Sequence, residues 1–181
     1  MTTFGISGGG RAVEEEFRRL TGATTTARAA LGDAVFEGVN IEVKAASSDT
    51  LNQVRAVKYI PLVAYGSTSA AWYVIPANVV VRMVATRARG QHTENPFESC
   101  TLSLRKLAAY RLHDPADLAD VLRAAIAEAA REPQLRDEMS RTLAESRATA
   151  ADSIARVRDL VVTSSWSDDQ LLARYRRPTP G

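Results

Sequence analysis

Three charged residues, Asp33, Glu42 and Lys44, stand in or beside two short apolar runs, where an unpaired charge is costly. Because successive side chains of a strand point to opposite faces, Glu42 and Lys44 are expected on one face and Ile41 and Val43 on the other. If the two runs form a hairpin, Asp33 lies close to Glu42. Two converging carboxylates repel each other, and a bound Mg²⁺ relieves that repulsion. A lysine beside such an ion can polarise an attacking water, which suits metal-assisted phosphodiester hydrolysis.

This spacing, Asp33 followed after eight residues by Glu42-Val43-Lys44, resembles the motif of the PD-(D/E)xK nuclease superfamily. The family includes most type II restriction endonucleases and the archaeal Holliday-junction resolvases, and the resemblance extends over about residues 10–76. Gly32 replaces the family's proline. The resemblance implies Mg²⁺ bound by Asp33, Glu42 and the Val43 carbonyl, with Lys44 acting on the water. It also implies products with a 5′-phosphate and a 3′-hydroxyl.

Two further residues are candidates for the same site. In nucleases of this type the N-terminal helix often supplies another acid, which points to Glu14 as a catalytic and metal-binding residue, with Glu15 and Glu16 as alternatives. A solvated helix face is the competing interpretation of this acidic run. Gln53 is the second candidate, because related nucleases often place a glutamine there to orient the phosphate or the water. A surface amide is the alternative for Gln53.

The polar segment 87–99, RARGQHTENPFES, is interpreted as a loop that reads DNA. Arginine pairs with guanine, and glutamine or asparagine with adenine, in the major groove. A plain surface loop is the alternative. Lys58 is interpreted either as a surface lysine or as a phosphate contact. The candidate DNA-binding residues are Arg87, Arg89, Gln91, His92, Asn95 and Lys58.

The elements that must position these residues follow from apolar spacing. Val13, Phe17 and Leu20 predict an amphipathic helix over 11–20, ended by Gly22. The segment 24–31 is a short helix or a loop, and 77–89 is a helix or a strand. A hairpin is expected over 34–46 and a helix over 47–59. Three more strands are expected over 60–66, 70–76 and 100–107.

From Asp114 the pattern becomes helical. Asp114 is the expected N-cap and Pro115 the first helical residue. Pro133 separates that helix from a long helical pattern. The sequence thus predicts an α/β fold with two regions: a restriction-endonuclease-like mixed β-sheet core flanked by helices over 1–112, and a helical C-terminal extension over 113–181. The extension is either a dimerisation arm or a layer that packs back on the sheet.

Composition excludes several classes of protein. With 45% apolar and 24% charged residues among 181, the chain is typical of a globular protein. The three lysines leave 20 of the 23 basic residues as arginine, the better phosphate ligand, although a GC-rich genome explains that bias equally well. One cysteine excludes an internal disulfide, and no apolar run is long enough to span a membrane. A cytoplasmic location is expected.

The predicted function is a Mg²⁺-dependent endonuclease of type II restriction type, acting on double-stranded DNA. Cutting both strands of a palindrome needs two active sites, so a homodimer is expected. The alternatives are a structure-specific nuclease on the same fold, such as a junction resolvase or a repair nickase, and a DNA-binding protein without turnover.

Overall fold

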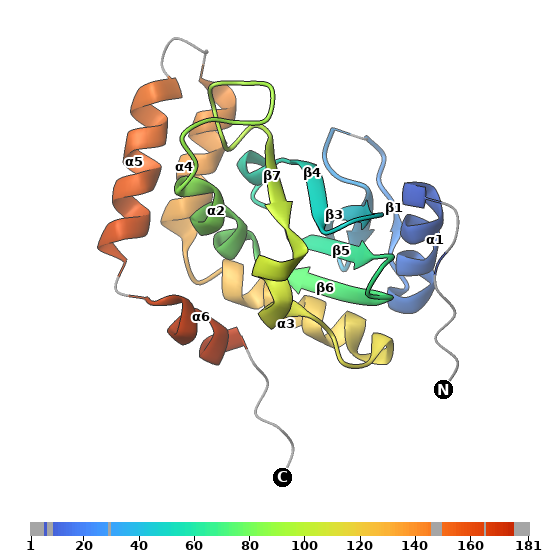
Figure 1. Cartoon of the computed structure of the whole chain (residues 1–181). Helices are drawn as coiled ribbons and strands as arrows, with labels where there is room; N and C mark the ends of the chain where they lie inside the picture. Colours follow the sequence, from blue (N-terminus) through green and yellow to red (C-terminus); the bar gives the residue numbers. More distant parts are fainter. Residues whose placement is uncertain (1–5, 7–8, 29, 146–149, 165, 176–181) are drawn as a thin grey trace.

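A five-stranded mixed sheet forms the centre of the computed structural model, which describes residues 6, 9–28, 30–145, 150–164 and 166–175 (Figure 1). The strand order is β1-β2-β3-β5-β6, with β3 and β5 parallel and the other neighbours antiparallel. A smaller antiparallel sheet pairs β4 with β7. The strands are β1 (Thr24–Thr25), β2 (Ala34–Phe36), β3 (Val39–Ala46), β4 (Thr50–Val54), β5 (Leu62–Gly66), β6 (Ala71–Ile75) and β7 (Cys100–Ser103).

Helices cover both faces of the main sheet. Figure 1 shows α2, α4 and α5 together on one side of the strands and α1 on the other. The helices are α1 (Gly9–Thr21), α2 (Ala77–Ala85), α3 (Leu118–Ala129), α4 (Pro133–Ala144), α5 (Ala150–Thr163) and α6 (Asp168–Tyr175). Short 3₁₀ helices are η1 (Ala56–Lys58), η2 (Leu104–Tyr110) and η3 (Pro115–Asp117). The predicted α/β class, with a mixed sheet flanked by helices, is confirmed.

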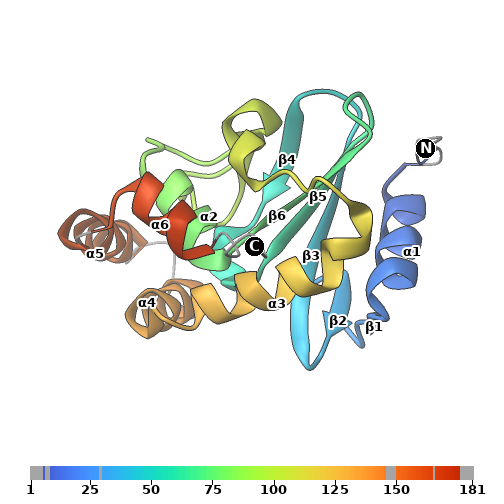
Figure 2. The ribbon, with the colours of Figure 1, turned by 90° about the horizontal axis from the view of Figure 1, so that it is seen from below.

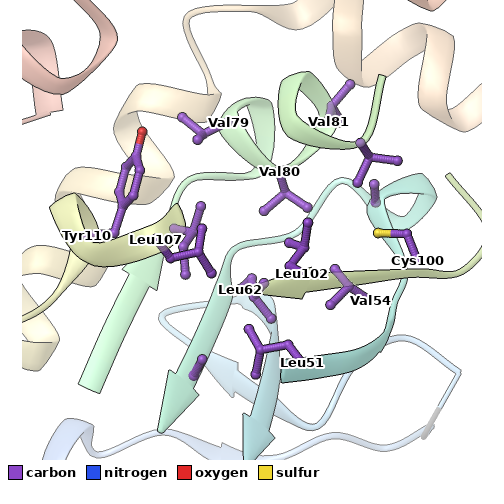
Figure 3. Close-up of a cluster of buried hydrophobic side chains, with 14 of the residues drawn as sticks. Leu51, Val54, Leu62, Val79, Val80, Val81, Cys100, Leu102, Leu107 and Tyr110 are labelled. Atoms are coloured by element: carbon purple, nitrogen blue, oxygen red, sulfur yellow. The ribbon is translucent and has the colours of Figure 1, made fainter. Parts of the chain in front are cut away.

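Two hydrophobic cores lie on opposite faces of this sheet, because side chains along β5 alternate between them. Val63 and Tyr65 belong to the first core, which contains residues of α1 and α3. Leu62 and Ala64 belong to the second, which contains residues of α2, β4, β7, η2, α4 and α5. Figure 3 shows part of the second core, and Figure 2 shows α1 and α3 beside the sheet.

Most elements lie where the apolar spacing predicted them. The helix over 11–20 is present as α1, with Val13 and Phe17 buried. The hairpin is present as β2 and β3, with Ala34 opposite Ile41. The strands predicted over 60–66 and 70–76 are present as β5 and β6, and the undecided segment 77–89 begins with helix α2. The segment from Thr24 contributes the two-residue strand β1 instead of a short helix.

The prediction of a helix over 47–59 is wrong. This segment forms β4 and then η1. Leu51 and Val54 are buried three residues apart, a spacing that also suits a helix. In the structure a register shift between them inserts one extra residue opposite β7, and Gln53 has a φ of 54° there. The bulge therefore gives two inward-facing strand residues a helix-like spacing.

The C-terminal helices pack back onto the core. Leu118 and Leu122 of α3 complete the first core. Asp114 caps the 3₁₀ turn η3 by accepting a hydrogen bond from Ala116 N–H, as expected for an N-cap followed by Pro115. The long helical pattern after Pro133 is divided into α4 and α5, and its apolar residues differ in how far they are buried. Leu135, Met139 and Val157 are buried in the second core, Ile154 and Leu160 pack against it, and Leu143 is exposed.

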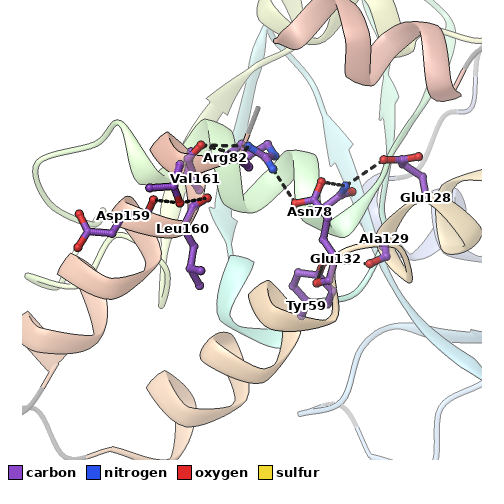
Figure 4. A network of polar contacts seen from close by, with 11 residues as sticks. Tyr59, Asn78, Arg82, Glu128, Ala129, Glu132, Asp159, Leu160 and Val161 are labelled. Atoms are coloured by element: carbon purple, nitrogen blue, oxygen red, sulfur yellow. Dashed lines mark hydrogen bonds and ion pairs between the residues drawn. The ribbon is translucent and has the colours of Figure 1, made fainter. Parts of the chain in front are cut away.

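A buried polar network ties these helices to α2 (Figure 4). The Asn78 amide donates to Glu128 and Glu132, at 3.3 and 3.2 Å. Arg82 donates to Glu132 at 2.6 Å and to the Ser164 hydroxyl at 2.6 Å. Breaking one partner of a buried ion pair leaves an uncompensated charge, so the network fixes the helices relative to α2. In the described part of the chain, no helix has the length and apolarity needed to cross a membrane.

Candidate active site

Asp33 is held against strand β3 by main-chain geometry. Its N–H donates to Ile41 O at 2.8 Å, and its carboxylate Oδ2 accepts from Val43 N–H at 2.8 Å. The side chain thus continues the β2–β3 ladder beyond the last paired residue. Gly32 permits this because its φ is 154°, and a Cβ there would lie 2.9 Å from Ile41 O. The acid is therefore fixed beside the Glu42–Val43 peptide, as the hairpin prediction required.

Glu42 is buried and bonded to two ammonium groups. Its side chain is 7% exposed, and its Oε1 lies 2.8 Å from Lys44 Nζ. Its Oε2 lies 2.7 Å from Lys58 Nζ, and the Lys58 side chain is only 10% exposed. Ile41 and Val43 belong to the first core, so the predicted alternation along β3 is observed. The structure therefore brings together Asp33, Glu42 and Lys44 and adds Lys58.

The two lysines determine the charge of Glu42. Burial alone would raise the pKa of its carboxyl, but the hydrogen bonds and charges of Lys44 and Lys58 outweigh burial and hold that pKa below its usual value. Glu42 is consequently an ionised carboxylate at neutral pH. Glu42 is therefore a buried negative charge that is held in place by two positively charged neighbours, Lys44 and Lys58.

Glu14 lies on α1, which packs against β3. Burial raises the pKa of Glu14, and the negative charge of Asp33 raises it further, whereas Arg18 and Lys44 lower it. Glu14 thus feels both Asp33 and Lys44, and it also lies 4.0 Å from Arg18. Of the three candidate acids of α1, Glu15 and Glu16 pair with Arg11 and Arg19, respectively. Of these three acids, Glu14 is therefore the one whose pKa responds to the charges of Asp33 and Lys44.

The oxygen atoms of the cluster can be compared with the ligands that Mg²⁺ prefers. Among the residues that the structure describes, no three or more His, Cys, Asp or Glu side chains are grouped to hold a metal ion. Mg²⁺ commonly uses one or two carboxylates, with water and substrate phosphate completing the shell. Asp33, Glu42 and the Val43 carbonyl are oxygen donors of this kind, and they lie on or beside the same strand. Both oxygens of Glu42 are bonded to lysine, however, so a cation must replace one ammonium there.

Gln53 lies on β4 beside the polar loop, and its predicted catalytic role stays a prediction. Its side chain is exposed, and its N–H donates to the Gln91 side chain at 2.8 Å. The Gln91 amide also donates to Asn52 at 3.3 Å. These two bonds anchor the loop to β4, so Gln91 has a structural use in addition to its predicted contact with DNA.

The predicted DNA-reading residues of the loop 87–99 divide into exposed and engaged groups. Arg89 and His92 are exposed and line a cavity of about 670 Å³ between the loop and α5. Arg87 donates to Thr101 O at 3.0 Å. Asn95 is 4% exposed, and its side-chain oxygen accepts from Phe97 N–H. Of the candidates on this loop, Arg89 and His92 are therefore the two that present exposed surface to a ligand.

Comparison of the chain with protein-family models, curated proteins and solved structures gave no match. The nuclease interpretation thus depends on the residues of the site. Sequence reasoning placed Lys58 among the DNA contacts and missed its bond to Glu42. The helix expected over 47–59 placed Lys58 on one face with Leu51, Val54 and Val57, and no spacing rule relates residue 58 to residue 42 across a bulged strand.

Proposed function

We propose that the protein is a Mg²⁺-dependent DNA endonuclease of the type II restriction kind. We propose further that it belongs to the PD-(D/E)xK superfamily, whose motif it resembles. The single observation that supports this proposal is the cluster at β3. There the Asp33 carboxylate is fixed 2.8 Å from Val43 N–H, and the Glu42 carboxylate is 2.8 Å from Lys44 Nζ. Two hard-oxygen ligands and an adjacent ammonium are the groups that metal-assisted phosphodiester hydrolysis requires.

The residues of the chain have separate tasks in the proposed reaction. Asp33 and Glu42 would hold the ion, with the Val43 carbonyl as a third ligand. When bound, Mg²⁺ stabilises negative charge on the phosphate oxygens. Lys44 orients the attacking water and offsets charge on the phosphorane. The water oxygen forms a bond to phosphorus as the bond to the 3′ oxygen breaks, which yields a 5′-phosphate and a 3′-hydroxyl.

Double-stranded DNA is the proposed substrate, and a homodimer the proposed active form, because two sites are needed to cut both strands. The exposed Arg89 and His92 of the loop are the proposed base-reading groups, since arginine pairs with guanine in the major groove. The proposed location is the cytoplasm, which suits a chain whose one cysteine is free and buried. Light scattering of the protein with and without DNA measures its molecular mass and so shows whether a dimer forms.

The test is incubation with unmethylated phage DNA in Mg²⁺, with EDTA as control, followed by sequencing of the fragment ends. The expected result is a set of discrete fragments with 5′-phosphates, formed only with Mg²⁺. Asp33→Ala and Lys44→Ala should each reduce the rate by roughly a hundredfold or more. Lys106→Ala removes an exposed lysine outside the cluster and should cut normally.

The same assay separates the competing functions. Cleavage of a four-way junction in preference to a linear plasmid would identify a structure-specific nuclease on the same fold. Retention of DNA binding with no cleavage at any Mg²⁺ concentration would identify a binding protein. Full restriction by both Asp33→Ala and Lys44→Ala in cells would show that the catalytic assignment is wrong.

A further inference from the structure

Lys58 has an unusual environment for a lysine. Its side chain is 10% exposed, and its ammonium lies 2.7 Å from Glu42 Oε2. A lysine that is this deeply buried is usually paired with a protein group, and the residues that cover it keep a phosphate of a large duplex out of contact. The geometry therefore directs Lys58 at a protein carboxylate rather than at DNA.

Lys58 and Asp33 belong to segments on opposite sides of the strand that carries Glu42. β3 lies between β2 and β5 in the sheet. Asp33 directly precedes β2 and bonds to Val43 N–H on that side. Lys58 belongs to η1, which leads into β5, and Glu42 N–H donates to Pro61 O at 3.1 Å on that side. A cation shared by Asp33 and Glu42 would therefore be held from the β2 side of the strand, the side opposite η1.

The two lysines differ in how firmly they are held. Lys44 is 26% exposed and lies two residues from Glu42 on the same strand. Lys58 is more buried and is carried by a turn whose next residue, Tyr59, bonds to two main-chain carbonyls: Tyr59 Oη donates to Ala129 O and Glu132 O, at 3.1 and 3.2 Å. Lys58 is thus the fixed partner of Glu42 and Lys44 the one free to move.

We propose that Lys58 is a positioning residue for the metal ligand Glu42. Its ammonium holds Oε2 from the η1 side, so that Oε1 is available to a divalent cation and Lys44 is released toward the attacking water. This inference rests on the proposed nuclease function, which it extends by assigning to Lys58 a role distinct from that of Lys44. It also predicts a cost: Lys58 is a second positive charge close to the cation, so it weakens cation binding while it orients the ligand.

The test compares wild type with Lys58→Met, Lys58→Arg and Lys106→Met. Calorimetry measures Mn²⁺ binding to each protein without DNA, and kcat is measured at saturating Mg²⁺. DNA affinity is measured by anisotropy in Ca²⁺. For Lys58→Met the expected result is Mn²⁺ binding at least threefold tighter, with kcat reduced at least thirtyfold and DNA affinity within twofold of wild type. Lys58→Arg should restore both values toward wild type, and Lys106→Met should match wild type.

The opposed changes in metal affinity and kcat distinguish positioning from damage, because a misfolded site would lose both. Wild-type values of both for Lys58→Met would overturn the inference while the nuclease function stands. A loss of DNA affinity above tenfold, with unchanged Mn²⁺ binding, would instead make Lys58 a phosphate contact. A wild-type protein that neither binds Mn²⁺ nor cuts DNA would overturn the proposed function and the inference together.

Discussion

Glu42 is the residue on which the electrostatics of the site depends. Its pKa is lower in the folded protein than in the unfolded chain, so its ion pairs stabilise the fold above the unfolded pKa of about 4.5. That stability is lost as the pH falls through the lower folded pKa. We expect Glu42→Gln, which leaves Lys58 buried without an anionic partner, to lose about 3 kcal/mol of unfolding free energy at pH 7 in EDTA.

Urea unfolding of wild type and Glu42→Gln at pH 7 and pH 3 measures this difference. The gap between the two proteins should shrink at pH 3, because pH 3 lies below the unfolded pKa of about 4.5, where the stability that comes from the lowered pKa of Glu42 declines. Glu15→Gln is the matched control: it removes an exposed carboxylate of α1 that pairs with Arg11, and exposed ion pairs contribute little to stability. An equal gap between wild type and Glu42→Gln at both pH values would contradict the assignment of the stability to the ionised carboxylate.

Cys100 gives a second prediction for a single residue. It is 2% exposed, and burial raises the pKa of its thiol to about 11. Since the thiolate is the reactive form, labelling by a disulfide reagent at pH 8 should be slow in the folded protein. We expect labelling at least a hundredfold faster in urea, as followed by absorbance. Rapid labelling without urea would show that β7 opens easily.

At the scale of secondary-structure elements, the turn into β2 depends on one glycine. Gly32→Ala places a Cβ 2.9 Å from Ile41 O in a backbone conformation that suits glycine. We expect a loss of about 1 to 3 kcal/mol of stability. Cleavage should fall more than tenfold, because Asp33 follows directly. Gly10→Ala is the matched control: its Cβ meets nothing within 4 Å, and alanine favours the helix α1.

Tyr59 links η1 to the junction of α3 and α4. Tyr59→Phe removes the hydroxyl that donates to Ala129 O and Glu132 O. We expect a loss of about 1 to 2 kcal/mol, since two carbonyls lose a partly buried donor. Thermal unfolding measures the loss, and hydrogen exchange should show faster opening of η1. Exchange unchanged at residues 56–58 would contradict this link.

The elements that sequence reasoning predicted are those with a clear local signal. α1 has the apolar spacing of a helix, β5 and β6 are short continuous apolar runs, and each is present. β4 was taken for a helix because its bulge, with Gln53 at positive φ, changes the spacing of Leu51 and Val54. The pairing of β4 with β7, about 50 residues later, overrides local propensity, and no local pattern reports such a partner.

At the scale of the whole molecule, the C-terminal third completes both cores. Leu118 and Leu122 are fully buried in the first, and Leu135 and Met139 are 1% and 0% exposed in the second. Fully burying each such side chain contributes roughly 1.5 to 3 kcal/mol. We therefore expect a fragment of residues 1–112 to unfold without cooperativity and to bind a hydrophobic dye. Circular dichroism during heating measures this, and a sharp transition would show an independent domain.

Sequence reasoning predicted the part of the site that lies within a single hairpin. Asp33, Glu42 and Lys44 lie within twelve residues, and strand alternation is enough to bring them together. Lys58 arrives through the parallel pairing of β3 with β5. That pairing depends on a crossover through β4 and η1, which the apolar pattern did not reveal.

The anchoring of Tyr59 on residues 129 and 132 has a consequence for the newborn chain. A ribosome makes a protein from its N-terminus, so the acids of β3 emerge well before the helices that brace η1. Until those helices dock, the turn beside Glu42 lacks the two hydrogen bonds that Tyr59 makes to them. Under the proposed nuclease function, we therefore expect cleavage to begin only after α3 and α4 have packed against η1 and the Lys58–Glu42 ion pair is held in place.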